Sequence, residues 1–167
     1  MKINIEIERS IVVPLPYKKI EPLLSNPEAT IGRMPKLRKL TRLEENAYLL
    51  EMRTMGSRIA NIAHDVSFGA RFLVKPNSGE LRWEPVPNQG NARISGFFRI
   101  APDSDDTNLR FRVWGELHDV PVPLLYRMVA PPFIQGKFTR MVDTFLEQTR
   151  EALVQGKTAR AAKKHAG

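Results

Sequence analysis

Five side chains in this sequence are candidates for proton transfer or anion binding: Arg9, Tyr48, His64, Asp65 and Tyr126. Tyrosine, histidine and carboxylate groups act as general acids and bases when they are held beside a reacting atom. The spacing identifies no partner for any of the five. The sequence also contains no nucleophile elbow, phosphate-binding glycine loop, dinucleotide fingerprint or paired-carboxylate motif. The catalytic residues therefore stay unknown, and binding is favoured over catalysis.

Metal and cofactor chemistry is disfavoured by composition. The chain has no cysteine, so it carries no disulfide, no thiolate nucleophile and no cysteine-type zinc site. The three histidines, His64, His118 and His165, are scattered along the sequence. Two of them precede aspartates, but neighbours on a strand point to opposite faces of a sheet. We expect no bound metal and no cofactor.

The 167 residues carry a net charge of +8, which favours anionic surroundings. Part of the charge lies in the basic segment 157–167, and part forms a local cluster consisting of Lys36, Arg38, Lys39 and Arg42. Such a cluster is typical of a solvated strand edge that prevents aggregation. The alternative is that the cluster and the basic tail contact an acidic partner or a membrane surface, with nucleic acid the less favoured partner.

The amino-terminal residues alternate apolar and charged side chains, and no run approaches the ~20 apolar residues that span a bilayer. These features predict a soluble, cytoplasmic protein. A chain of this length can bury a core without disulfide bonds. We expect one domain over residues 1–154, followed by a basic flexible tail over residues 155–167.

The elements that must position these groups are mostly strands. Residues 3–13 alternate with a period of two, which predicts a half-buried strand. Comparable patterns predict further strands at 37–43, 47–54, 65–75, 80–85, 92–101 and 107–118. Residues 55–64 fit a turn at Gly56 and Ser57, with Ile59 and Ile62 on a short strand or a crossing loop. Paired first and last strands would set Glu6 and Glu8 against Arg110 and Arg112.

Two kinds of helix are predicted. A short helix over 17–24 and a second one capped by Asn26, with Pro27 in its first turn, follow the first strand. Near the carboxy terminus, apolar residues at steps of three and four predict one long helix with a buried stripe. Pro131 and Pro132 interrupt its hydrogen-bond ladder, so the long helix is expected from Phe133 to Leu153.

Together these features resemble the START/polyketide-cyclase/birch-pollen-allergen superfamily (SRPBCC). The resemblance rests on a first strand ending in Ile11-Val12-Val13-Pro14, a helix pair containing Asn26-Pro27-Glu28, a run of hairpins and the final helix Phe133–Leu153. It covers residues 1–154. It implies an α+β helix-grip fold, in which a curved seven-stranded antiparallel sheet wraps around the long helix, with two short helices after strand 1. Such folds enclose a pocket for lipids, sterols or polyketides.

Mapping the inward-facing positions onto that fold nominates a ligand-binding wall. Its members are mostly aromatic residues and methionines, which suit an adaptable apolar pocket but suit a dry core equally well. They are Tyr48, Met52, Phe68, Phe72, Trp83, Phe98, Phe111, Ile134, Phe138, Met141 and Phe145, together with Arg9. Arg9 either contacts an acidic group of the ligand or reaches water where the strand twists. Inward-facing small residues, including Gly96 and Gly115, either leave a hollow or mark bends in the sheet.

The segment before the long helix is expected at the mouth of this pocket. Its apolar members are Leu124, Leu125, Tyr126, Met128 and Val129. The segment is either a gate hinged at the prolines or Gly136, or a rigid corner. The predicted function is binding of a hydrophobic small molecule, as a carrier or accessory protein. The alternative is a polyketide cyclase or aromatase that uses the same cavity.

Overall fold

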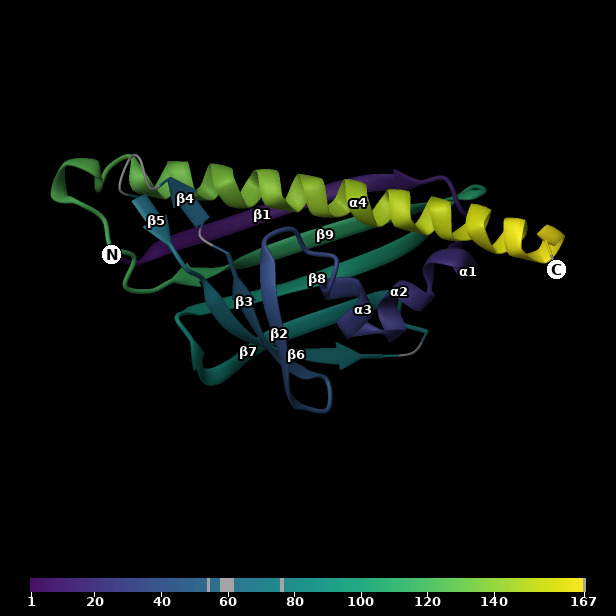
Figure 1. The fold of residues 1–167 in the computed structure, drawn as a ribbon, viewed down its shortest axis with the longest axis horizontal. Coiled ribbons are helices and arrows are strands. Elements are labelled where there is room, and N and C mark those ends of the chain that lie inside the picture. The colour runs from purple at the N-terminus through teal and green to yellow at the C-terminus, as the bar shows by residue number, and fades with distance from the viewer. Residues whose placement is uncertain (54, 58–61, 76, 167) are drawn as a thin grey trace.

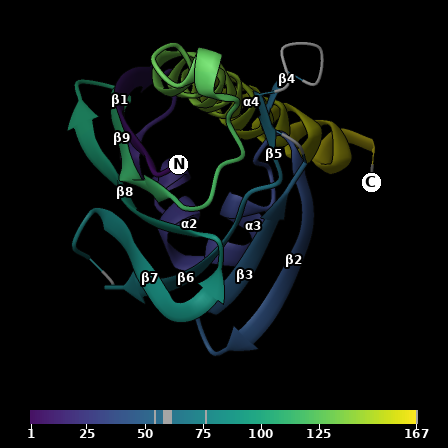
Figure 2. The same ribbon diagram turned by 90° about the vertical axis from the view of Figure 1, so that its left-hand side faces the viewer.

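The computed structural model describes all residues except 54, 58–61, 76 and 167, and describes side chains outside 54–63, 76 and 157–167. Its centre is a curved antiparallel sheet of seven strands in the order β1-β9-β8-β7-β6-β3-β2 (Figures 1 and 2). The strands are β1 Ile3–Val13, β2 Leu37–Glu44, β3 Ala47–Met52, β6 Ser67–Val74, β7 Glu80–Gly90, β8 Ala92–Asp103 and β9 Asp106–Leu117. The predicted fold class, an α+β domain with this sheet, is confirmed.

The ambiguous region after β3 forms a separate two-stranded sheet. It consists of β4 Met55–Ser57 and β5 Ile62–His64, and β4 contacts the long helix. The expected position of Ile59 lies outside the described residues. The sheet is a small flap beside the beginning of the long helix (Figure 1).

The predicted pairing of the first and last strands is confirmed. β1 pairs with β9 along its whole length, with Ile7 opposite Val113. The charge match is also present: Arg112 Nη2 lies 2.8 Å from Glu6 Oε1, and Arg110 Nε donates to Glu8 Oε1 at 2.7 Å. These exposed pairs fix the register of two strands that are far apart in the sequence.

Short helices follow β1 as predicted, but the first is divided. The segments are α1 Tyr17–Ile20, α2 Pro22–Ser25 and α3 Pro27–Ile31. The division falls before Pro22, because proline has no N–H to continue the hydrogen bonding of α1. Asn26 caps α3 as predicted, its side-chain oxygen accepting a 3.2 Å hydrogen bond from the Ala29 N–H.

The long helix α4 spans Ala130–Ala166 and begins three residues earlier than predicted. Pro131 and Pro132 lie in its first turn, where a helix leaves its N–H groups without helical partners, so prolines are tolerated. A 3₁₀ turn, η1 Leu124–Tyr126, precedes it. The helix also continues past residue 154 into the segment expected as a flexible tail, and that domain boundary stays a prediction.

Polar contacts tie α4 to the edge strand β1. The Gln135 side chain accepts from the Glu6 N–H at 3.2 Å and donates to the Glu6 carbonyl at 2.7 Å. Farther along, Arg9 Nε lies 2.8 Å from Asp143 Oδ1. The amide of Gln135 thus occupies backbone groups that an edge strand would otherwise leave open.

Candidate functional site

The interior between the concave face of the sheet and α4 holds nearly all of the predicted ligand wall. Every predicted wall residue except Arg9 is buried there. Arg9 is exposed and paired with Asp143 on α4, so its guanidinium lies outside this interior. The structure therefore favours the solvent-exposed alternative for Arg9, whereas the binding role of the other residues stays a prediction.

Six of the wall residues form a continuous series of ring contacts that we call the aromatic belt: Tyr48, Phe72, Trp83, Phe98, Phe111 and Phe145. Neighbouring ring centroids lie 4.7 to 6.3 Å apart, within the range of favourable tilted and edge-to-face pairs. Phe145 on α4 closes the belt by contacting both Phe98 and Phe111. The belt therefore crosses the sheet from β3 to β9 and reaches the helix.

The remaining wall residues form a second group, the Met-Phe group: Met52, Phe68, Ile134, Phe138 and Met141. In the described part of the chain neither Phe68 nor Phe138 makes a ring contact. Met52 ends β3, Phe68 opens β6 and Ile134 lies in the first turns of α4, so the group is displaced from the belt toward β4 and β5. Thioether side chains repack more readily than interlocked rings.

One polar atom of the belt has no partner. The Trp83 side chain is 2% exposed, and its Nε1 makes no hydrogen bond in the described part of the chain. Leaving an indole N–H unpaired in apolar surroundings is unfavourable. The interior therefore contains one indole N–H that could donate a hydrogen bond to a ligand.

The glycines on the concave face do not create a hollow. A Cβ on Gly96 would lie 2.3 Å from Trp83 Cζ2, so the indole already fills the space beside this residue. A Cβ on Gly115 would lie 2.0 Å from the Arg93 carbonyl oxygen on the neighbouring strand. Both glycines permit close packing within the sheet, which corrects the idea that they subtract volume for a ligand.

The acid-base candidates are not brought together. Tyr48 is buried, and its hydroxyl lies 3.5 Å from Glu28 Oε2 on α3. Burial, followed by the negative charge of Glu28, raises the pKa of Tyr48, and Arg42 opposes this shift. Tyr126 and Asp65 are exposed. Among these three residues only Tyr48 is buried, and its hydroxyl lies beside the exposed residue Glu28.

His64 on β5 is partly buried, and its Nε2 is a second buried atom without a partner in the described residues. Burial lowers its pKa below the ordinary 6.5, while Asp65 and Asp119 act in the opposite direction. Across the part of the chain that the structure describes, no three His, Cys, Asp or Glu side chains are grouped closely enough to hold a metal ion.

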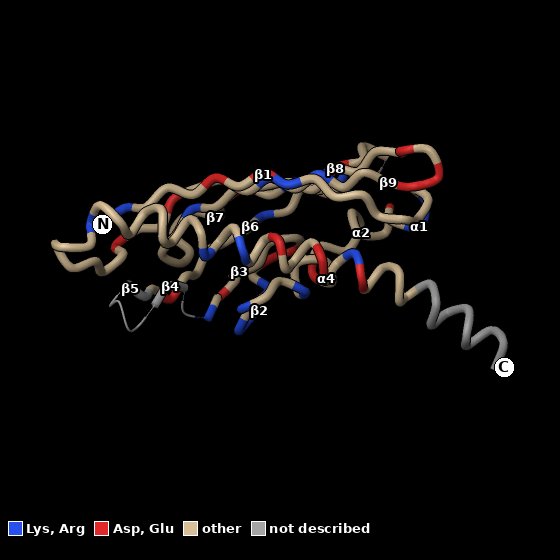
Figure 3. The backbone as a smooth tube through the Cα atoms, turned by 90° about the horizontal axis from the view of Figure 1, so that it is seen from above, with Lys and Arg blue, Asp and Glu red and all other residues tan. Residues whose placement is uncertain are grey.

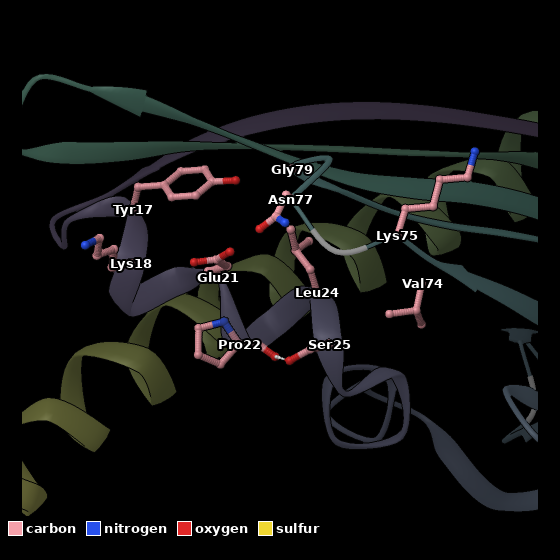
Figure 4. A pocket seen from close by; sticks show the side chains of 10 residues that line it. All are labelled: Tyr17, Lys18, Glu21, Pro22, Leu24, Ser25, Val74, Lys75, Asn77 and Gly79. Atoms are coloured by element: carbon pink, nitrogen blue, oxygen red, sulfur yellow. Dashed lines mark hydrogen bonds between the residues drawn. The ribbon is translucent and has the colours of Figure 1, made fainter.

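A separate surface pocket of about 290 Å³ lies between α1, α2 and the β6–β7 connection (Figure 4). Its lining combines the apolar residues Leu24 and Val74 with the charged residues Lys18, Glu21 and Lys75. Ser25 is held by its own hydrogen bond to the Pro22 carbonyl. None of the predicted wall residues lines it. We prefer the interior as the site for an apolar molecule, because its wall residues are buried, whereas this pocket lies open at the surface beside charged side chains.

Comparison with solved structures shows the same architecture. A protein from Thermus thermophilus matches with a TM-score of 0.68 and 13% identity, covering 90% of this chain and 98% of that one. A START superfamily protein from Mycobacterium smegmatis matches with a TM-score of 0.58 and 18% identity, over 89% and 98% of the two chains. The chain shares the helix-grip fold of these structures. The resemblance seen in the sequence is confirmed at the level of this helix-grip fold.

The Zhui aromatase/cyclase from Streptomyces sp. R1128 shares the helix-grip fold, with a TM-score of 0.58 and 14% identity over 95% of this chain and 96% of its own. No protein-family model and no curated protein sequence matches the chain. At these identities the likeness establishes the fold, and the chemistry must be argued from this chain's own residues.

Two features of the helix-grip interior escaped sequence reasoning. The contact between Tyr48 and Glu28 joins β3 to α3, and no local pattern signals it. The Trp83 N–H is unpaired because no described residue on another element places an acceptor beside it, which a local pattern does not reveal. The polar attachment of Gln135 to β1 had one usable signal, a polar residue directly beside the apolar stripe of the long helix.

Proposed function

We propose that the chain binds a hydrophobic small molecule between the sheet and α4 and acts as a carrier or accessory protein. The observation that carries the proposal is the unpaired Trp83 N–H within a mainly apolar interior. A mainly apolar ligand with one acceptor oxygen would satisfy this donor. Buried polar groups of this kind orient ligands in apolar sites.

The Met-Phe group is the part of the wall that yields to the ligand. Its side chains lack the ring contacts that join the aromatic belt. Moving Met52, Phe138 and Met141 therefore disrupts fewer specific contacts than moving belt residues. The ligand would lie against the belt, with its acceptor at Trp83.

The fold supports this proposal without selecting the ligand. Its relatives by structure include a START superfamily protein and an aromatase/cyclase. Both share the arrangement of a long helix over a curved sheet. A lipid, a sterol or a polyketide-like molecule would each suit a mainly apolar interior that offers the Trp83 N–H as a donor.

Binding can be tested with Trp83 as the reporter. The chain has two tryptophans, so Trp114→Phe leaves Trp83 as the only one. We expect cis-parinaric acid, a polyene fatty acid, to quench Trp83 by energy transfer in a saturable manner. In the same background, Phe138→Asp should abolish saturation, because a carboxylate in the interior disfavours the apolar chain.

Phe97→Asp is the matched control. Phe97 is 3% exposed but lies on the outer face of the sheet beneath Arg99, whose guanidinium is 3.9 Å from the ring centroid. Ile134→Phe adds bulk without charge and should weaken binding if the interior is the site. If Phe138→Asp and Phe97→Asp are both folded and weaken binding equally, the interior is not the site. The same holds if only Lys75→Glu, in the lining of the surface pocket, abolishes binding.

A second candidate function is proton transfer by Tyr48 to a bound polyketide-like substrate. It is favoured by the partly buried hydroxyl beside Glu28 and by the raised pKa of Tyr48, which keeps the phenol protonated as a general acid. Turnover of a poly-β-keto substrate should fall in Tyr48→Phe while binding persists. Unchanged turnover in that variant would remove the assignment.

A further inference from the structure

The connection between β9 and α4 carries an exposed apolar patch. Five of the eight large apolar side chains exposed in the described part of the chain lie within six consecutive residues. We call them the apolar turn: Leu124, Leu125, Tyr126, Met128 and Val129. Figure 1 shows this connection projecting from the end of the molecule where α4 begins, opposite the carboxy terminus.

The side chains of the apolar turn are presented on an ordered backbone. Leu125 is 91% exposed and Met128 is 92% exposed, so neither contributes to the core. The Tyr126 N–H donates to the Pro123 carbonyl at 2.9 Å, and the Val129 N–H donates to the Tyr126 carbonyl at 3.1 Å. Clustered apolar exposure on a defined turn marks an interaction surface.

The chain segment that carries the apolar turn has charges of one sign. Between Asp119 and Asp143 the chain has no acidic residue, but it has Arg127, Lys137 and Arg140. Arg127 lies within the turn, is exposed, and has no ion pair in the described part of the chain. A cation beside projecting apolar tips matches the boundary between anionic headgroups and acyl chains in a bilayer.

We propose that the apolar turn docks the protein on an anionic lipid surface, with Leu124, Leu125 and Met128 entering the acyl boundary and Arg127 remaining among the headgroups. A second protein is the less suitable occupant, because stable protein interfaces bury about 800 Å² on each partner and a single projecting turn offers less. The net charge of +8 favours the same orientation toward anionic lipid. This inference does not require that the interior binds a ligand.

Vesicle flotation tests the docking. Wild-type protein should float with vesicles of phosphatidylcholine mixed with phosphatidylglycerol, and less with phosphatidylcholine alone. Leu125→Glu and Met128→Glu should each lower the partition coefficient on the order of tenfold or more, because each places a charge where an apolar tip enters the lipid. Arg127→Ala should reduce binding to the mixed vesicles more than to neutral ones.

Val12→Glu is the matched control, since Val12 is 46% exposed on β1 at the end of the sheet away from the turn, opposite Asn108. It should float like wild type. Circular dichroism checks that each variant is folded. Absence of flotation, or equal loss in Val12→Glu and Leu125→Glu, would overturn the proposal. The proposal would also be overturned if the wild type did not float but formed a dimer, measured by light scattering, that Leu125→Glu dissociates.

The basic cluster on β2 provides the competing explanation for vesicle binding (Figure 3). Lys39 and Arg42 are both exposed on this strand. If Lys39→Glu and Arg42→Glu abolish flotation while Leu125→Glu does not, the apolar turn is not the docking site. We expect the opposite order, with the turn variants showing the larger loss.

Discussion

The aromatic belt and the Met-Phe group are equally buried but differently held. Phe145 in the belt is 0% exposed and Phe138 in the Met-Phe group is 3% exposed. Phe145 makes two ring contacts at 5.7 and 5.8 Å, whereas Phe138 makes none in the described part of the chain. Burial alone therefore does not distinguish a rigid core from a wall that can yield.

The difference also has a direction along α4. The helix α4 begins beside β4 and β5 and runs toward the end of the molecule where α1 lies (Figure 1). Ile134 and Phe138 precede Phe145 along this helix. A ligand that displaces the Met-Phe group would enter at the end beside β4 and β5. The proposed membrane-docking turn immediately precedes the same part of the helix, so the two proposals meet at one end of the molecule.

The largest expected effect is on stability. Phe145→Ala should lower the free energy of unfolding by about 3–5 kcal/mol, because it leaves a cavity in a fully buried site. This loss of stability should exceed the loss caused by Phe138→Ala by about 1–3 kcal/mol, because only Phe145 makes two aromatic pairs that the substitution removes. Urea denaturation of both variants measures this difference. Equal losses would mean that the ring contacts do not make the belt the more rigid region.

The next largest effect on stability is expected from the hydrogen bonds that attach α4 to β1. Gln135→Ala removes two hydrogen bonds to the Glu6 backbone, and we expect a loss of about 1 kcal/mol because both groups can regain water. Arg9→Ala removes an exposed ion pair and should change stability by less than about 0.5 kcal/mol. Urea denaturation compares the two. A larger loss of stability in Arg9→Ala would mean that the ion pair between Arg9 and Asp143, rather than Gln135, is the main attachment of α4 to β1.

A smaller effect, of opposite sign, is expected at Gly136. A Cβ there would meet only Arg140 Nη2, at 4.0 Å, so Gly136→Ala should stabilise the protein by about 0.5–1 kcal/mol through helix propensity. If Gly136 is also a hinge beside the Met-Phe group, the variant should slow ligand release in stopped-flow experiments. Gly156→Ala, with no atom within 4 Å of its Cβ, is the control that should leave ligand release unchanged.

The fold followed from the sequence because its signals are local. Period-two alternation in β1 and the asparagine cap of α3 are decided by neighbouring residues. The predicted start of α4 at Phe133 is wrong because a proline pair interrupts a helix only when it lies in the helix interior. In the first turn of a helix prolines are tolerated, and the helix begins at Ala130. The local pattern at 131–132 does not distinguish the two cases.

The candidate site was predictable only as a set of inward-facing residues. Alternation identifies Phe138 and Phe145 as buried, but not which of them has ring partners, since those partners lie on β8 and β9. The same limit applies to the Tyr48 and Glu28 contact. Division of the wall into belt and Met-Phe group depends on contacts between residues far apart in the sequence.

The smallest expected effect concerns pH at the Met-Phe end. Because the pKa of His64 is lowered in the folded state, chiefly by burial, the unfolded chain binds more protons around and below pH 6.5. Stability from this group is therefore present above 6.5 and is lost as the pH falls below that value. Thermal melts from about pH 8 to about pH 5.5 should show a shallower decline in His64→Gln than in wild type.

Glu116→Gln is the control for that measurement. The pKa of Glu116 is lowered below 4.5, first by its hydrogen bond with His118, so its stabilisation is lost only as the pH falls below the His64 range. Across the range from about pH 8 to about pH 5.5 this variant should parallel wild type. If His64→Gln also parallels wild type, the imidazole is not held neutral by burial, and the Met-Phe end is more open to water than the belt.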